Sequence, residues 1–285
     1  MPPTTGGEPP IFPYEVPLLA ACNSRPLPGE LDFRFRMLRF RPMIHETRLS
    51  VVAEVPLSNF TFETEGDTYR AWFSLLVMIR DQDGKIVRKV SQDYPLEGPS
   101  DKVKSLLASE IIFIRHVQLP PGRYSVEVAA YDRESNRAGA RRSILVVPSK
   151  PEGVEISSLS VIRRIDPVDA GADDEENPFL VESGKIVPDL KGRIQSESGG
   201  EVGIFMLVYP NKGGTEDPVL LLDVSRDGQA VGQVLLDLPA PNEDGEIPYV
   251  ATLPVSGLEP GRYEVRAEAR QGSTSAVEHL FFTVD

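Results

Sequence analysis

One short phrase occurs twice in this sequence and constrains the fold more than any other feature. Leu119–Tyr124 has the letters LPPGRY, and Leu258–Tyr263 has LEPGRY. The residues after each tyrosine alternate between apolar and polar, which predicts a half-buried strand. A Pro-Gly turn that places a tyrosine at the start of a strand is typical of a corner in immunoglobulin-like sandwiches, where the phenol bonds to upstream backbone. Two copies therefore predict two sandwiches, with Tyr124 and Tyr263 as structural corners.

Alternating residues and turn residues predict strands along both halves of the chain. The first half has expected strands at residues 31–41, 47–56, 69–80, 85–93, 109–117, 123–132 and 137–147, with a slip of phase at Met37-Leu38. The second half has them at 155–164, 179–187, 190–196, 202–209, 218–224, 229–237, 247–254, 262–270 and 275–284. A helix of a turn or two is expected at residues 100–107, after a Ser or Asp cap.

Asp-Gly pairs predict one tight hairpin turn in each half, at Asp83-Gly84 and Asp227-Gly228. These pairs and the Pro-Gly-Arg-Tyr phrases recur in the same order, at offsets of 144 and 139 residues. The two halves are therefore expected to be diverged duplicates.

The predicted fold is all-β, with two tandem immunoglobulin-like (fibronectin III-like) antiparallel β-sandwiches. Their expected bounds are residues 30–150 and 151–285, with a linker rich in proline between them. Residues 1–29 are rich in Pro and Gly and are predicted to form an extended segment. The run Trp72–Ile79 is apolar on both faces, as in a central strand, and we expect Trp72 to fill the core beside Tyr124.

Charge is divided unevenly between the two halves. The whole chain has a net charge of −13, but residues 151–285 hold 10 Lys and Arg against 25 Asp and Glu. An acidic half repels phosphate backbones, so no nucleic acid partner is expected. No run of 18 apolar residues is present, so no membrane-spanning helix is expected.

The segment Val16–Cys22 looks like the cleavage box of a bacterial lipoprotein. No Lys or Arg precedes it, and prolines interrupt the apolar region that such a signal requires. Lipidation is therefore not the favoured interpretation. Cys22 is the only cysteine, so no disulfide can form within the chain.

No pattern in the sequence predicts a catalytic or cofactor site. His45, His116 and His279 have no second ligand at metal-binding spacing, and no Gly-x-Ser-x-Gly elbow occurs. Asp223–Asp227 partly resembles the Asp-x-Ser-x-Ser metal motif of von Willebrand factor A domains, but Asp227-Gly228 predicts a hairpin where that motif opens a helix. We therefore expect a protein that is not an enzyme and has no cofactor.

Two charged segments could bind ligands. The acidic loop that begins at Asp166 offers oxygen ligands for calcium from Asp166, Asp169, Asp173 and Asp174, although a solvated loop is the more common explanation. The first strand carries Arg34, Arg36, Arg39 and Arg41, which could form a stripe for an anionic ligand such as a polysaccharide. The other explanation for the stripe is the solvent-exposed face of an edge strand, where charges prevent pairing with a strand of another chain.

Several phrases together resemble a known family. They are Pro17–Ala21 leading to Pro26–Pro28, then Thr47–Leu57, Asp81–Val87 and Asp132–Gly139. The region 14–165 is similar to the β-rich region that follows the von Willebrand factor A domain in VWFA-related proteins of Acidobacteria, and to sandwich segments of GWxTD-motif proteins. The resemblance implies a sandwich fold and a secreted or envelope-associated bacterial protein. The A domain itself and the Gly-Trp-x-Thr-Asp motif are not present in this sequence, so no functional residue is carried over.

The sequence thus favours a non-enzymatic structural or protein-interaction module with an unidentified protein partner. Edge strands and loops at the ends of the sandwiches are expected to make the contacts. The alternative is a carbohydrate-binding module, for which the chain offers a single Trp and no evident row of exposed aromatics.

Overall fold

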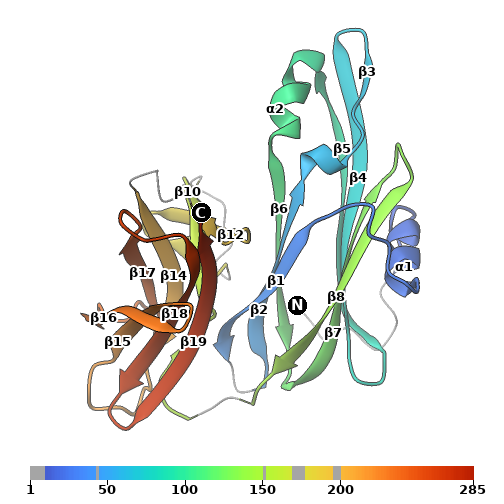
Figure 1. Cartoon of the computed structure of the whole chain (residues 1–285). Helices are drawn as coiled ribbons and strands as arrows, with labels where there is room; N and C mark the ends of the chain where they lie inside the picture. The colour runs from blue at the N-terminus through green and yellow to red at the C-terminus, as the bar shows by residue number, and fades with distance from the viewer. Residues whose placement is uncertain (1–9, 43–44, 150–151, 169–176, 195–199) are drawn as a thin grey trace. The chain divides into compact units, whose positions relative to one another are not determined.

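The computed structural model describes residues 10–42, 45–149, 152–168, 177–194 and 200–285. Its contacts divide the chain into two compact units (Figure 1). The first unit comprises the residues up to Met37 together with Val51–Pro148, and the second comprises Leu38–Ser50 together with Ser149–Asp285. The segment Leu38–Ser50, which the sequence interpretation assigns to the first sandwich, therefore belongs with the second unit.

The first half of the chain forms eight described strands, of which seven were predicted; β3 was not predicted, and β5 extends six residues beyond its predicted end. They are β1 Arg34–Pro42, β2 Thr47–Pro56, β3 Glu63–Glu65, β4 Thr68–Arg80, β5 Ile86–Pro99, β6 Glu110–Leu119, β7 Gly122–Asp132 and β8 Arg137–Val147. A 3₁₀ turn at Leu57–Asn59, a second at Ser100–Lys102 and the helix α2 Val103–Leu107 lie between them. One sheet has the order β3-β4-β7-β8 with β5 also paired to β4, and the other has the order β1-β2-β6.

The second half adds eleven described strands in two sheets. They are β9 Glu155–Ile156, β10 Ser160–Asp166, β11 Leu180–Val181, β12 Gly184–Asp189, β13 Arg193–Ile194, β14 Glu201–Tyr209, β15 Val219–Arg226, β16 Gln229–Asp237, β17 Ile247–Pro254, β18 Gly261–Gln271 and β19 Thr274–Val284. One sheet has the order β11-β12-β10-β14-β17, with β9 paired to β14. The other has the order β13-β19-β18-β15-β16, and only its short β13–β19 pair is parallel. The all-β sandwich prediction is confirmed.

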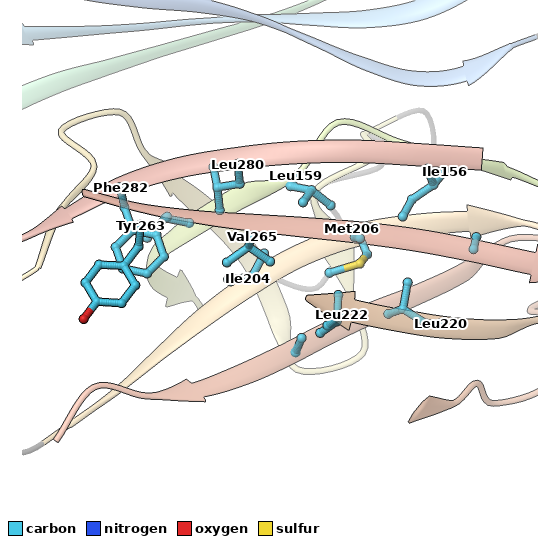
Figure 2. Packing of buried hydrophobic residues seen from close by; sticks show 14 of the residues in the cluster. Ile156, Leu159, Ile204, Met206, Leu220, Leu222, Tyr263, Val265, Leu280 and Phe282 are labelled. Atoms are coloured by element: carbon cyan, nitrogen blue, oxygen red, sulfur yellow. The ribbon is translucent and has the colours of Figure 1, made fainter. Parts of the chain in front are cut away.

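The core of the second unit is built from alternate residues of its strands. Ile204 and Met206 on β14, Leu220 and Leu222 on β15 and Val265 on β18 are buried in one cluster (Figure 2). Because side chains alternate across a strand, one face of each strand supplies this cluster and the other face stays outside it. The inward faces of the strands therefore form the apolar interior of this sandwich.

Both predicted corner tyrosines make the same hydrogen bond. The hydroxyl of Tyr124 donates to the backbone carbonyl oxygen of Pro120 at 2.8 Å. The hydroxyl of Tyr263 donates to the backbone carbonyl oxygen of Glu259, also at 2.8 Å. Tyr263 also stacks on Phe282, with ring centroids 5.4 Å apart (Figure 2). Each corner thus ties the start of a strand to backbone four residues upstream.

The N-terminal segment is not extended throughout, as the sequence interpretation expected. Residues Glu15–Asn23 form the helix α1, in which Leu18, Ala21 and Cys22 are buried. These three residues pack in one cluster with Leu76 and Met78 of β4 and with Ala129 and Ala140 of β7 and β8. Pro17 lies in the first turn of the helix, where a missing N–H costs no internal hydrogen bond. The outer face of β4 is therefore apolar because a helix covers it.

A buried ion pair holds the beginning of this helix. Glu15 is fully buried, and its carboxylate accepts hydrogen bonds from Lys89 Nζ at 2.5 Å and from Ser91 Oγ at 2.6 Å. Burial opposes the charged form of Glu15, but these hydrogen bonds outweigh it and hold the pKa of the carboxyl below its ordinary value. Helix α1 is thus joined to β5 by polar contacts and to β4 by apolar ones.

The end of β1 belongs to the second unit because its residues pack there. The Ser158 backbone N–H donates to the Arg39 carbonyl oxygen at 2.8 Å, and the Arg39 N–H donates to Ser158 Oγ at 3.0 Å. The Phe40 ring meets Phe179 edge-on, with centroids 5.2 Å apart. The unit boundary at Met37-Leu38 coincides with the predicted slip of phase, because Phe33 is buried before it and Leu38 and Phe40 are buried after it.

Candidate functional site

The four arginines of the predicted anionic-ligand stripe do not form an open cationic row. Arg34 lies 3.9 Å from a buried carboxylate oxygen of Glu54. Arg39 pairs with Glu278, and Arg41 Nη1 pairs with Glu246 Oε1 at 3.1 Å. Arg36 also has a partner within the protein.

The stripe is also divided, since Arg34 and Arg36 belong to the first unit and Arg39 and Arg41 to the second. Burial raises the pKa of Glu246, although the guanidinium of Arg41 opposes the shift. Arg39 and Arg41 thus balance carboxylates of the second unit, and an anionic-ligand site on the stripe stays a prediction from sequence.

The predicted calcium ligands fall largely outside the described residues. Asp169, Asp173 and Asp174 lie there, and the carboxylate of Asp166 is engaged by Arg164, with Nε 2.7 Å from Oδ1. Within the ranges that the structure describes, no three His, Cys, Asp or Glu side chains gather as a metal site would require. The calcium site remains a prediction from sequence.

Asp223, the first residue of the partial metal motif, has both carboxylate oxygens in use. Arg266 Nη1 donates to Oδ2 at 3.1 Å, and the side-chain amide of Gln233 donates to Oδ1. Strands β15 and β16 pair antiparallel around Asp227-Gly228, as the hairpin interpretation predicts. This acidic residue therefore belongs to a polar ladder across the sheet.

Trp72 does not fill the core beside Tyr124, and this expectation was wrong. Its ring is half-buried, its indole Nε1 donates to Asp93 Oδ2 at 2.7 Å, and the guanidinium carbon of Arg133 lies 4.0 Å from the ring centroid. In the register of β4 and β7, Arg80 pairs with Ser125, next to Tyr124. Trp72 lies eight residues away along β4, which is about 26 Å at the rise of a strand. The sequence pattern locates a strand but not the partner of each residue.

Strand β16 is the most open edge of the second unit. It pairs with β15 on one side, and within the described residues no strand pairs with its other side. Every residue of β16 except Leu236 is exposed, and Leu235 exposes 60% of its surface. From Gln229 to Leu236 it contains no charged residue and no proline. Such an edge offers unpaired backbone N–H and C=O groups together with apolar side chains.

The other edge strands of the second unit have features that hinder pairing with an additional strand, namely short length or proline. Strands β11 and β13 have two residues each, and β17 contains Pro248 and Pro254, which lack the N–H that a ladder needs. Strand β16 has nine residues, with a bulge where the register with β15 shifts beside Val224. After the bulge, Gly232–Asp237 continue in regular pairing with Val219–Val224. The uninterrupted free edge is therefore six residues long.

The sequence located β16 correctly but did not indicate that it is an edge. The signal that could have found it is the uncharged run from Gln229 to Leu236, which is unusual in an acidic half of the chain. Strand β16 is an edge because its only described neighbour is β15, whose other side is taken by β18 from a distant part of the chain. No local pattern contains that information.

Comparison with known proteins adds little to this description. No protein-family model matches the chain, and no curated protein matches it. Among solved structures, the transglutaminase of red sea bream matches at 7% identity with a TM-score of 0.26, over 89% of this chain and 31% of that one. The BSP domain of a biofilm associated protein matches at 15% identity with a TM-score of 0.26, over 88% and 29%.

This chain thus spans about a third of the length of the solved structures it matches. At these TM-scores neither likeness carries an argument about activity. In the described ranges, no helix has the length and apolarity needed to cross a membrane. The fold defines the chain as an all-β protein with sandwich units, and β16 is a free edge of the second unit.

Proposed function

We propose that this chain is a non-catalytic protein-interaction module that accepts an extended segment of another protein as an additional strand beside β16. The observation that carries the proposal is the free, uncharged edge of β16 in a sheet whose other edge strand is short. An added strand would pair with the backbone of Gly232–Asp237, which supplies affinity. Because side chains alternate across a strand, exposed Val234 and Leu235 lie on opposite faces. Alternate side chains of the added strand would lie beside Val234, on the face that also carries Leu236, which supplies preference for apolar residues.

Charge argues for a partner with basic residues around an apolar centre. Residues 151–285 have a net charge of −15, and Asp227 and Asp237 lie at the two ends of β16. A second copy of the chain is disfavoured, because antiparallel pairing of two β16 strands would bring these acidic ends together. A segment with Val or Leu at alternate positions and Lys or Arg at its ends fits the edge without repulsion.

The resemblance of residues 14–165 to the sandwich regions of VWFA-related and GWxTD-motif proteins supports a further part of this proposal. On this basis we propose that the module is part of a secreted or envelope-associated bacterial protein. Separation of cell fractions and detection of the native protein with an antibody would test this part independently of the binding experiment.

The binding proposal is tested with a displayed library of random peptides and the purified protein. We expect the selected peptides to show alternating apolar residues with basic ends, and to slow hydrogen exchange of the β16 amides when bound. Leu235→Lys should weaken these peptides by at least about tenfold, because it places a cation beside the strand. Affinity should fall with added salt.

Phe281→Lys is the matched control, since Phe281 is 46% exposed on the same sheet but lies on β19, whose neighbours in the sheet are β13 and β18, away from the β16 edge. It introduces the same charge and should leave peptide binding nearly unchanged. Selected peptides that leave the β16 amides unprotected would contradict the proposal. A dimer of the chain itself that Leu235→Lys dissociates would identify a second copy as the occupant and would also overturn it.

A further inference from the structure

A cavity of about 510 Å³ lies in the first unit between the N-terminal segment and the sheet that contains β4 and β7. The N-terminal segment and α1 contribute apolar residues to it, namely Pro13, Val16, Pro17 and Ala20. Strand β4 contributes Ser74, β7 contributes Tyr131, and the turn after β7 contributes Arg133. Cavities of this size suit a small ligand or a few residues of a peptide.

Arg133 is the charged group of this cavity, and it is held in place. Its backbone N–H donates to the Trp72 carbonyl oxygen at 2.9 Å, and its exposed guanidinium stacks on the Trp72 ring at 4.0 Å. Within the described part of the chain, no carboxylate pairs with this guanidinium.

Neighbouring acids are engaged elsewhere. Asp93 accepts hydrogen bonds from Trp72 and Ser74, and Glu134 Oε1 lies 3.3 Å from Arg70 Nε. Arg133 thus presents donors for an external anion.

The hydroxyl groups that line the cavity are already hydrogen-bonded. Tyr14 shares a bond of 2.9 Å with Ser91, Tyr131 donates to Asn136 at 2.7 Å, and Ser74 donates to Asp93 at 2.5 Å. A sugar carries many hydroxyls and would find few free partners here. The site therefore fits a ligand with an apolar body and a single carboxylate.

The apolar surface continues beyond the cavity. Phe12 stacks on Tyr14 with ring centroids 5.6 Å apart, and Ile11, Phe12 and Val16 are exposed. A ligand that covers this surface as well must be longer than a simple organic acid. We propose that this cavity binds the C-terminal carboxylate and the last apolar side chains of a peptide, with Arg133 as the carboxylate-binding residue.

The experiment uses an array of peptides with apolar C-terminal residues, each made with a free and with an amidated C-terminus. Binding is followed by the fluorescence of Trp72, the only tryptophan in the chain. We expect a subset of peptides to bind at least about tenfold more tightly in the free form, because an Arg–carboxylate pair is a strong, charge-assisted interaction. Arg133→Gln should remove this preference, and the amidated peptides should bind wild type and variant equally.

Arg262→Gln is the matched control, because Arg262 is also an exposed arginine that lies over an aromatic ring, that of Phe281 in the second unit. It should leave peptide binding unchanged. Loss of binding in both variants, or equal binding of free and amidated peptides throughout the array, would overturn the proposal. Short aliphatic or aromatic acids that bind as tightly as the peptides would show that the ligand is a small carboxylate and would overturn the peptide assignment.

Discussion

Replacing Leu18 by Ala tests whether α1 is an integral part of the first unit. Leu18 is fully buried and packs in one cluster with Leu76 and Met78 of β4. The substitution removes three carbon atoms from a buried side chain, at about 0.8 kcal/mol for each. This transfer cost is about 2.4 kcal/mol, and the cavity left behind adds to it. We expect the free energy of unfolding of the first unit to fall by about 3 kcal/mol.

Trp72 makes this measurement specific to one unit. It is the only tryptophan in the chain and lies on β4 in the first unit. Urea unfolding followed by tryptophan fluorescence therefore reports the unit that α1 covers. The transition midpoint of Leu18→Ala should move to clearly lower urea with little change in slope.

Val16→Ala is the control on the same helix. Val16 exposes 58% of its surface, so its truncation removes little buried area. Alanine is also the better helix former, and we expect a change within about 0.5 kcal/mol. An unchanged midpoint in Leu18→Ala would refute the packing of α1 on the sheet. The segment would then be the extended tether that its Pro and Gly content predicts.

Three further predictions concern single contacts. Tyr124→Phe and Tyr263→Phe should each lower the free energy of unfolding by about 1 kcal/mol through the lost corner hydrogen bond, and a differential scanning calorimeter that records no shift would contradict this. Burial raises the pKa of the Cys22 thiol to about 12, so a thiol reagent at mildly alkaline pH should react far more slowly with native than with urea-unfolded protein, and equal rates would count against the buried position. The pKa of Glu15 is lowered in the folded protein, so its contribution is present above the ordinary value of 4.5 and lost as the pH falls below it. Acid unfolding followed by Trp72 fluorescence should therefore be less steep in Glu15→Gln than in wild type, and identical acid curves would disprove the role of the pair with Lys89.

Local sequence predicted the strands because their signals are local. Alternating residues mark a half-buried strand wherever it lies, and Asp227-Gly228 supplies the positive φ angles that a tight hairpin turn requires, with φ of 49° and 81°. The corner hydrogen bonds of Tyr124 and Tyr263 span four residues, so the donor and the acceptor of each bond both lie within the repeated six-residue phrase. These features depend on neighbours along the chain.

The candidate sites could not be predicted in the same way. Strand β16 ends its sheet because β18 takes the other side of β15, and Arg39 and Arg41 of β1 pair with Glu278 and Glu246 from more than 200 positions away. The sequence did not predict helix α1 because its apolar face is short and lies among prolines. The helix is stabilised by packing on β4, which is a tertiary contact. Each of these outcomes depends on residues far apart in the sequence.

The sequence by itself thus determined the all-β class, the position of the main strands and the two tyrosine corners, because alternation and turn chemistry act over a few residues. The tertiary structure alone decided that Leu38–Ser50 belongs with the second unit, that Arg133 covers Trp72 beside a cavity, and that β16 is a free edge. The physical reason is that burial and charge pairing are properties of surfaces that meet in space. The proposed sites of this protein lie on such surfaces.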